Sequence, residues 1–385
     1  MVKMMTAYTE EVDEVEDGIA ELLGQIDLGA LKKNSVGIVN CHFDFIHPGF
    51  IAEMHRKLPF DFIGMTTMAS TNPQGQGMYS LALTVLTSDE LAFETGISES
   101  LSAEGHRGEI EAAYLGAASR LPGKPSLIVT AFPNLKHLSG ADIHKSLDKI
   151  CGGVPIWGGA ATHTDASYEN CFTFRNGDLS KDSLAMLLVH GPVDPEFIII
   201  SLPLRNIQKN QGKITSSEGC LLKEINGIPA TTYLEKSLGV TMISNAPLIT
   251  PLIVYYEGTP GPVAMAIYAD NDDGSVSCGG EVPEGASVAI GEITIDSIMT
   301  SAREALDRAL GCGHRNGMLV LSCVSRHVML FNHEDELKLI DGKMGNGKAM
   351  PYMAGYCAGE ICPVRDRNGA LRNRFHNFTF SACVF

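Results

Sequence analysis

Two periods of apolar residues run through this chain, one typical of helices and the other of strands. The run SLALTVLTS (80–88) alternates with a period of two and predicts a strand, whereas 109–121 has helical spacing. Near the N-terminus an amphipathic helix is predicted from the apolar residues Val12, Val15, Ile19, Leu22 and Leu23. Strand-like and helical runs then alternate from residue 35 onwards.

Three segments repeat one order of elements: a strand, a helix, an apolar turn rich in glycine, and a closing strand. They begin at VGIVNCHFDF, SLIVTAFP and MLVLSCVSRHVML, and the third closes with RFHNFTFSACVF. We expect the glycines of the three turns to adopt backbone conformations that other residues avoid; these are Gly64, Gly158, Gly159, Gly355 and Gly359. As the closing strand pair of the third repeat, the final residues are predicted to be buried sheet.

A length of 385 residues predicts two domains rather than one core. We expect an α+β fold with mixed, largely antiparallel sheets covered by helices. Residues 1–34 are predicted as an amphipathic helix and lead-in, 35–206 as an N-terminal domain, and 207–385 as a C-terminal domain. The boundary is placed where the apolar FIIISLPL gives way to the polar NIQKNQGK.

Composition and charge exclude several function classes. A formal net charge of −16 argues against nucleic-acid binding, which needs clustered Lys and Arg. No apolar run is long enough to cross a bilayer, and no signal peptide is recognisable, so a cytoplasmic location with free thiols is predicted for the ten cysteines. Without a CxxC pair, a GxxxxGK[ST] loop or a GxSxG elbow, no structural zinc, nucleotide or hydrolase motif is expected.

Cys323 and Arg326 stand in LSCVSRHV, at the predicted end of a strand. Cys323 is either a thiolate activated by Arg326 or a small buried residue, which is the commoner case. The planar guanidinium of Arg326 suits a carboxylate, and that carboxylate belongs either to a ligand or to Glu360. In the second case the pair would hold two strands together without binding anything.

Polar residues also follow the glycine turns. Glu360 comes directly after Gly359, while His376 and Asn377 lie between phenylalanines on the last strand. A histidine beside aromatic rings is more often a hydrogen-bonded core residue than a ligand or a base. The repeat predicts that the turns gather on one face, together with their equivalents in the first half: Thr66, Thr67, Gly158, Gly159, Thr162 and Asp165.

These motifs resemble the FIST sensory domains. LVLSCVSRHVML, YMAGYCAGEICP and RFHNFTFSACVF are similar to the Cys-x-x-Arg strand, the Gly-Tyr-x-x-Gly-Glu turn and the His-Asn-x-Thr closing strand of that family. FIGMTTMAS and VPIWGGAATHTDASYENCFTFRNG support an N-terminal FIST half. The resemblance covers about 35–385.

The resemblance implies a cytosolic sensor of small molecules that works beside histidine kinases, chemoreceptors or cyclic-dinucleotide enzymes. Because no such segment is visible in this chain, we expect the output to pass through a separate partner. No cofactor is expected, although some relatives resemble haem proteins that sense nitric oxide. The resemblance and the repeat together mark ten residues for ligand binding: Cys323, Arg326, Tyr356, Gly359, Glu360, His376, Asn377, Thr66, Gly159 and Thr162.

Three functions follow from these residues. The first is binding without catalysis, in which Arg326 holds the carboxylate of an amino-acid-like ligand while Glu360, Tyr356 and Asn377 take its polar groups. The second is a haem-based gas sensor with His376 or His327 as axial ligand. The third is an enzyme with Cys323 as nucleophile and one of those histidines as base.

Overall fold

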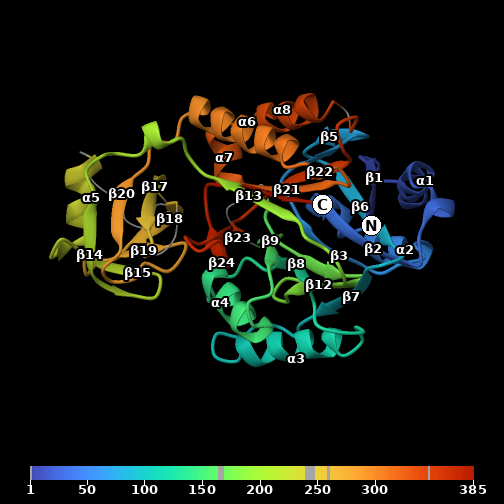
Figure 1. Ribbon diagram of the computed structural model, residues 1–385, viewed down its shortest axis with the longest axis horizontal. Coiled ribbons are helices and arrows are strands. Elements are labelled where there is room, and N and C mark those ends of the chain that lie inside the picture. Colours follow the sequence, from blue (N-terminus) through green and yellow to red (C-terminus); the bar gives the residue numbers. More distant parts are fainter. Residues whose placement is uncertain (1, 164–168, 239–247, 258–260, 346) are drawn as a thin grey trace.

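Three six-stranded sheets and one antiparallel barrel make up the protein in a computed structural model (Figure 1). The structure describes all residues except 1, 164–168, 239–247, 258–260 and 346. The three sheets surround a common core and form what we call the body. The barrel lies to one side of it (Figure 1).

The three sheets of the body share one strand order. The first contains β1 (Lys3–Thr9), β6 (Leu81–Ser88), β2 (Asn34–Cys41), β3 (Phe62–Thr66), β10 (Thr173–Arg175) and β11 (Asp178–Ser180). The second contains β7 (Ala92–Ile97), β12 (Ala185–His190), β8 (Leu127–Phe132), β9 (Ile156–Ala160), β23 (Glu360–Arg365) and β24 (Leu371–His376). The third contains β13 (Glu196–Ile200), β25 (Phe380–Val384), β21 (Met318–Cys323), β22 (Tyr352–Cys357), β4 (Ser70–Asn72) and β5 (Gly75–Gly77).

In each sheet the third and fourth strands run parallel, and the second strand runs antiparallel to the third. Helices connect the parallel strands: α2 (Phe50–Lys57), α4 (Gly140–Cys151), and α7 (Val324–Met329) followed by α8 (Asp335–Met344). The predicted repeat of strand, helix and strand is therefore confirmed, and so is the α+β fold class with mixed sheets covered by helices.

The hairpin that completes each sheet comes from a different repeat. The hairpin β4–β5 follows β3 of the first sheet, but β4 pairs with β22 of the third. The hairpin β10–β11 follows β9 of the second sheet, but β10 pairs with β3 of the first. The hairpin β23–β24 follows β22 of the third sheet, and β23 pairs with β9 of the second. The three repeats thus exchange their hairpins in a cycle.

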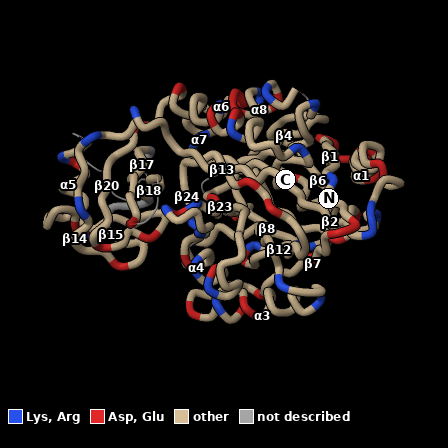
Figure 2. The backbone as a smooth tube through the Cα atoms, viewed as in Figure 1, with Lys and Arg blue, Asp and Glu red and all other residues tan. Residues whose placement is uncertain are grey.

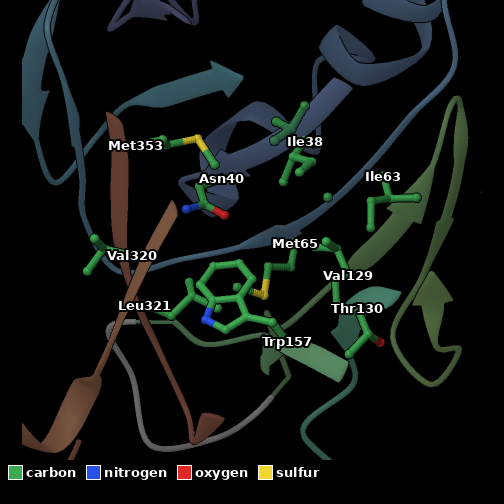
Figure 3. A pocket seen from close by; sticks show the side chains of 13 residues that line it. Ile38, Asn40, Ile63, Met65, Val129, Thr130, Trp157, Val320, Leu321 and Met353 are labelled. Atoms are coloured by element: carbon green, nitrogen blue, oxygen red, sulfur yellow. The ribbon is translucent and has the colours of Figure 1, made fainter. Parts of the chain in front are cut away.

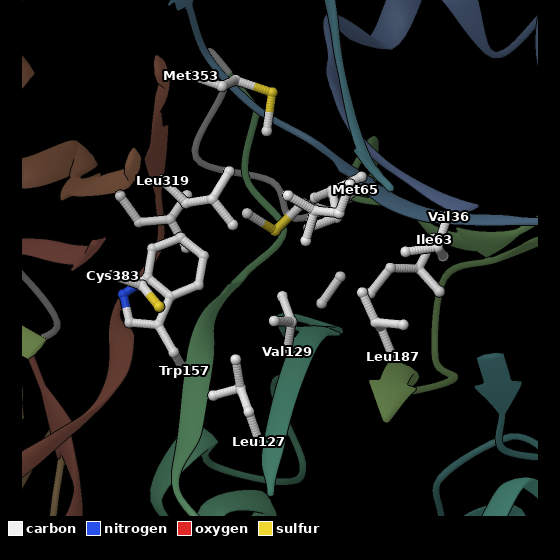
Figure 4. Close-up of a cluster of buried hydrophobic side chains, with 14 of the residues drawn as sticks. Val36, Ile63, Met65, Leu127, Val129, Trp157, Leu187, Leu319, Met353 and Cys383 are labelled. Carbon is white, nitrogen blue, oxygen red and sulfur yellow. The ribbon is translucent and has the colours of Figure 1, made fainter. Parts of the chain in front are cut away.

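The inner faces of the three sheets pack against one another around Trp157 (Figure 4). Ile63 and Met65 come from the first sheet, Val129 and Leu187 from the second, and the third supplies residues such as Leu319 and Met353. Helices cover the outer faces: α1 (Val15–Gln25) and α2 on the first sheet, α3 (His106–Ala118) and α4 on the second, and α6 (Ile295–Gly311) and α8 on the third. Burial of this apolar surface supplies the main driving force for the fold.

The barrel is formed by 212–290. Its strands pair in the order β14 (Gly212–Glu218), β20 (Ser287–Ile290), β17 (Leu248–Tyr255), β18 (Val263–Asp270), β19 (Val276–Cys278), β15 (Leu221–Ile225) and β16 (Ile228–Pro229). Because β14 also pairs with β15, the sheet closes on itself. The helix α5 (Ala230–Leu238) follows β16. The sequence DNDDG forms a turn that connects β18 to β19 through Gly274, whose φ is +83°.

The chain enters and leaves the barrel at one place, where Gln208 N donates to Ile290 O (2.9 Å) and Glu292 N donates to Asn206 O (2.8 Å). The predicted boundary between 206 and 207 falls at this crossing. Residues 207–385, predicted as one C-terminal domain, contribute to both parts: the barrel takes 212–290, and the remainder returns to the body.

The expected role of the glycines is wrong at four of five positions. Among them only Gly359 has a positive φ (+117°), whereas Gly64, Gly158, Gly159 and Gly355 lie inside β3, β9 and β22. These four are required for close packing instead. A Cβ atom on Gly158 would lie 1.9 Å from the carbonyl oxygen of Thr130.

Lys, Arg, Asp and Glu residues lie mainly along the helices and loops around the sheets (Figure 2). Among the described helices, none combines the length and the apolar character needed to span a membrane. The sequence analysis did not predict β1 or β7, which are edge strands of the first two sheets.

Candidate functional site

The C-terminal residues form three buried strands in two different sheets. β23 and β24 complete the second sheet, whereas β25 lies between β13 and β21 in the third. Glu360 begins β23, and Thr379 immediately precedes β25. The predicted burial is confirmed for 355–363 and 375–385 except for Ala358, which is half-buried, whereas the tip of the β23–β24 hairpin, 364–372, is half-buried or exposed.

A hydrogen bond at each corner of the body joins two neighbouring sheets. Ser70 Oγ is 2.8 Å from Ser80 Oγ, between the third sheet and the first. Thr173 Oγ1 donates to the carbonyl oxygen of Ser183 (2.5 Å), between the first and the second. Thr379 Oγ1 donates to Glu360 Oε2 (2.5 Å), between the second and the third. Only the last corner contains an ionisable group.

Glu360 is fully buried among weak hydrogen-bond donors. Cys357 Sγ donates to its Oε1 at 3.3 Å, and the Cys323 thiol also interacts with this carboxyl group. Burial raises the pKa of Glu360 to about 8, although the hydrogen bonds from Thr379 and Cys357 oppose this shift. The carboxyl group is thus protonated at neutral pH. Burial, and then the neighbouring Glu360, raise the pKa of Cys323 to about 12.

Arg326 does not pair with Glu360, contrary to one of the two readings of the sequence. Its partner is Glu336 of α8, whose Oε1 accepts from Nε (3.1 Å) and Nη2 (2.5 Å). The remaining guanidinium N–H groups donate to Ser301 Oγ, Ser201 O and Ile298 O, at 3.0 to 3.2 Å. All five donors of Arg326 are therefore used, and its side chain is only 1% exposed.

Tyr356 and His327 lie beside this ion pair. Their rings are 4.5 Å apart, and both side chains are fully buried. Burial, followed by the charge of Glu336, raises the pKa of Tyr356, while burial lowers the pKa of His327. Both residues belong to the packing between α7 and the third sheet.

The predicted residues of the first half, together with Glu360, form two contacts between neighbouring strands. Thr66 and Thr162 meet at the ends of β3 and β9, where Thr162 N donates to Thr66 O (3.0 Å). Gly159 and Glu360 are paired neighbours on β9 and β23. Asp165 lies outside the described residues.

Asn377 connects the body to the barrel. Its N–H donates to Ala264 O (3.1 Å) on β18, and its Oδ1 accepts from Ala266 N (3.2 Å) on the same strand. Gly359 lies close to it, since a Cβ on that glycine would be 3.0 Å from Asn377 Nδ2. Asn377 therefore helps to hold the barrel against the body, and the absence of a side chain at Gly359 leaves room for its amide.

The centre of the body holds a small cavity where the three sheets meet (Figure 3). It is lined by Asn40, Met65, Trp157, Leu321 and other inner-face residues. Its volume of about 20 Å³ is enough for a single water molecule. Asn40 Nδ2, which has no hydrogen-bond partner within the described chain, is the group that such a water would satisfy. No larger ligand fits here.

A much larger cleft, of about 750 Å³, lies between the body and the barrel. One side is formed by four residues of β13, 196–199, together with Ser201 just beyond the strand. The end of α6 and the strands β23 and β24 form the walls, and 261–263 of the barrel also line it. A volume of this size is typical of small-molecule sites.

Polar and charged groups stand at several points of this cleft. Arg308 and Arg365 contribute guanidinium groups that are mostly exposed, and Glu196 lies 3.6 Å from Arg365. His376 and Thr379 also line the cleft, so Thr379 connects it to the buried Glu360. Burial lowers the pKa of His376 to about 3, and its Nε2 is 3.2 Å from Cys362 O. His376 is therefore a neutral hydrogen-bonding group.

Of the ten predicted site residues, only His376 lines this cleft. The sequence analysis missed Phe197, Ile199, Ser201, Arg308 and Arg365. An available signal was the dense basic run RDRNGALRNR, which contains Arg365. The other four come from β13 and α6, which approach one another only in the folded chain.

Comparison with known proteins agrees with the resemblance found in the sequence. A model of the FIST N domain matches 35–228, and a model of the FIST C domain matches 229–363. Among curated proteins none matches. Similar solved structures include a cyanuric acid hydrolase from A. caulinodans, with 9% identity, a TM-score of 0.28, and coverage of 50% of this chain and 72% of that one. That likeness is too weak to support an argument.

The two family models together cover most of the chain and meet between 228 and 229, inside the barrel. FIST domains are recognised as small-ligand sensory domains of signal transduction. The chain belongs to the FIST family.

Proposed function

We propose that this protein senses a small carboxylate-bearing ligand, which it binds in the cleft between the body and the barrel. The observation that supports this most strongly is the composition of the cleft. It brings together β13 from the FIST N segment and residues from both parts of the FIST C segment. A ligand in this position would contact both the body and the barrel, and a shift between them would be the signal.

Arg308 and Arg365 are the proposed carboxylate partners, in place of Arg326. Each is paired with a glutamate, but the arginine side chains are 60% and 53% exposed, and exposed ion pairs are weak. A ligand carboxylate can therefore compete for them, whereas the five donors of Arg326 are already bound. His376 and Thr379 would receive the polar groups of the ligand.

A thermal-shift screen against amino acids and small carboxylates tests this proposal. A ligand at about a hundred times its dissociation constant stabilises the folded state by roughly 2.7 kcal/mol. We expect one class of carboxylates to raise the melting temperature, and Arg308→Ala and Arg365→Ala to abolish the increase. Arg303→Ala, an exposed arginine of the same helix outside the cleft, should leave it intact. An increase that survives both cleft variants would refute the proposed position.

Haem is a second candidate ligand, because His376 lines the cleft. Its Nε2 is bonded to Cys362 O, so axial ligation would use Nδ1 or break that bond. A Soret band after addition of haemin to the wild type, absent from His376→Ala, would support this alternative. Catalysis by Cys323 has less support, because a thiol with a pKa near 12 is a poor nucleophile at neutral pH.

We further propose a cytoplasmic location and a separate output partner, such as a histidine kinase, a chemoreceptor or a cyclic-dinucleotide enzyme. All ten cysteines are free, which agrees with a reducing compartment. Proteins that co-purify with this chain from cells grown with and without the carboxylate found in the screen would be compared. A partner whose recovery depends on that carboxylate would support the proposal.

A further inference from the structure

β13 is an edge strand of the third sheet, and the cleft runs along its open side. β25 pairs with one side of it, and no other described strand pairs with the other side. Four residues of the strand, 196–199, line the cleft, together with Ser201 just beyond it. The strand reads EFIII and contains neither lysine nor proline, which commonly block exposed edges.

The register shows which backbone groups point into the cleft. Cys323 N donates to Thr379 O, and Phe385 N donates to Gly317 O, so the odd-numbered residues of β25 are bonded to β21. Bonding directions alternate along an antiparallel strand, so the even-numbered residues bond to β13. Their partners are Glu196, Ile198 and Ile200. The N–H and C=O groups of Phe197 and Ile199 therefore face outward.

The other two sheets block the equivalent positions with side chains. Ser80 and Thr379 occupy equivalent corners, and the residue two positions after each is Ala82 and Ser381. Ala82 pairs with Tyr8 of β1, and Ser381 pairs with Ile199 of β13. Tyr8 is therefore the counterpart of Ile199. The amide of Gln25, at the end of α1, bonds both backbone groups of Tyr8: it accepts from Tyr8 N and donates to Tyr8 O, each at 2.8 Å.

The position equivalent to Phe197 is blocked in the second sheet. Leu187 and Cys383 each lie four positions after a corner residue, Ser183 and Thr379. Leu187 pairs with Thr95 of β7, and Cys383 pairs with Phe197. Thr95 is therefore the counterpart of Phe197. Arg120 Nη2 donates to Thr95 O at 2.7 Å. For Phe197 and Ile199 themselves, the described part of the chain provides no such side-chain cap.

The open stretch of β13 has a defined end and charged walls. Arg326 Nη1 donates to Ser201 O (3.2 Å), which closes the edge just beyond β13. Arg308 on one wall and Arg365 on the other are suited to acidic groups of an occupant. A second copy of this chain carries a net charge of −16 and is a poor candidate to pair edge to edge.

We propose that the occupant of this cleft is an extended peptide segment with acidic side chains, which adds a strand to the third sheet beside β13. Phe197 and Ile199 provide two N–H donors and two C=O acceptors for its backbone, as in other cases of strand addition. Five residues of strand span roughly 16 Å, so a segment of about that length would contact the whole edge. The inference rests on the proposed function, because it names the ligand class of the same cleft.

The test uses an array of seven-residue peptides with alternating apolar positions and one or two glutamates, measured by fluorescence polarisation on the full chain. Ile199→Pro removes the outward N–H and leaves every bond between β13 and β25. Ile199→Ala is the matched control, because it loses the side chain but keeps the N–H. We expect Ile199→Pro, and N-methylation of alternate peptide amides, to weaken binding about ten-fold, with a smaller effect of Ile199→Ala.

Each outcome is decisive. Equal binding to wild type and Ile199→Pro, with both variants melting cooperatively, would show that the edge is not used. If no peptide binds while small carboxylates still raise the melting temperature through Arg308 and Arg365, the peptide inference fails and the proposed function stands. If neither class binds, both fail. A wild-type dimer that Ile199→Pro converts to a monomer would assign the edge to a second copy instead.

Discussion

The side chain of Glu360 is a carboxylic acid buried in the interior of the body. Its carboxyl group is neutral when folded at neutral pH, because burial raises its pKa to about 8. In the unfolded chain a glutamate has a pKa of about 4.3. The folded state therefore binds a proton that the unfolded state releases, and the stability gained from this proton is complete below about pH 4 and declines as the pH rises to about 8.

The pH dependence of stability should reveal this proton. Between pH 6.5 and 7.5 the wild type should lose about 1 kcal/mol of unfolding free energy relative to Glu360→Gln, whose neutral amide does not titrate. Urea denaturation of both proteins across this range measures the difference. Other groups, such as the buried histidines, contribute equally to both proteins, so they cancel in the comparison. Parallel pH profiles would show that Glu360 has an ordinary pKa.

Arg326 and Glu336 form a buried ion pair with a structural role. Arg326→Ala leaves the carboxylate of Glu336 buried without its cationic partner, although Ser322 Oγ still donates to its Oε2 at 2.7 Å. We expect a loss of about 3–5 kcal/mol in the free energy of unfolding, measured by denaturant. The double replacement Arg326→Met with Glu336→Leu should cost less than this single change. Arg308→Ala, which breaks an exposed pair with Glu304, should cost at most about 1 kcal/mol. A mild effect of Arg326→Ala would contradict this role.

The strand β9 depends on glycine because it lies extremely close to β8. At the scale of elements, the parallel pair β8–β9 brings Gly158 opposite Thr130. A side chain at this point would push the two strands apart. Gly24, in contrast, lies in α1 with nothing within 4 Å of its missing Cβ.

Alanine at these two glycines should have opposite effects. Gly158→Ala is expected to lower the free energy of unfolding by about 2 kcal/mol or more, through overpacking in the core. Gly24→Ala should raise it by about 0.5–1 kcal/mol, because alanine favours the helix. Chemical denaturation of the two variants provides the measurement. A tolerated Gly158→Ala would mean that β8 and β9 can separate at little cost.

Much of the element order could be predicted from the sequence. Helical spacing identified α1 and α3, and the three repeats predicted the order of strand, helix and strand in the body. The partner of Arg326 could not be predicted, because Glu336 and Glu360 are equally compatible with the local pattern and only the packing of α8 decides between them. The residues that line the cleft also escaped prediction, since β13, α6 and 261–263 are far apart in sequence and meet only after folding. The role of the glycines was predicted wrongly because close packing and a positive φ both require glycine, and the sequence does not distinguish the two causes.

At the scale of the whole molecule, the barrel is an insertion whose two ends lie side by side. Replacing 209–289 by a short Gly-Ser linker should therefore leave a body that unfolds cooperatively. Circular dichroism melts and size-exclusion chromatography would measure this. The body should lose some stability, because Asn377 no longer bonds to Ala264 and Ala266. Aggregation of the shortened chain, despite an intact linker, would show that the body requires the barrel.

The cyclic exchange of hairpins has a consequence for synthesis in the cell. The first sheet is complete once Asp178–Ser180 of β11 has been made, but the second must wait for β24 and the third for β25. Although β9 is translated early, one of its edges stays unpaired until β23 (Glu360–Arg365) has been made. During that interval the nascent chain exposes apolar strands that favour aggregation. We therefore expect this protein to depend on chaperones that hold nascent chains, more than a protein of equal length whose repeats close one at a time.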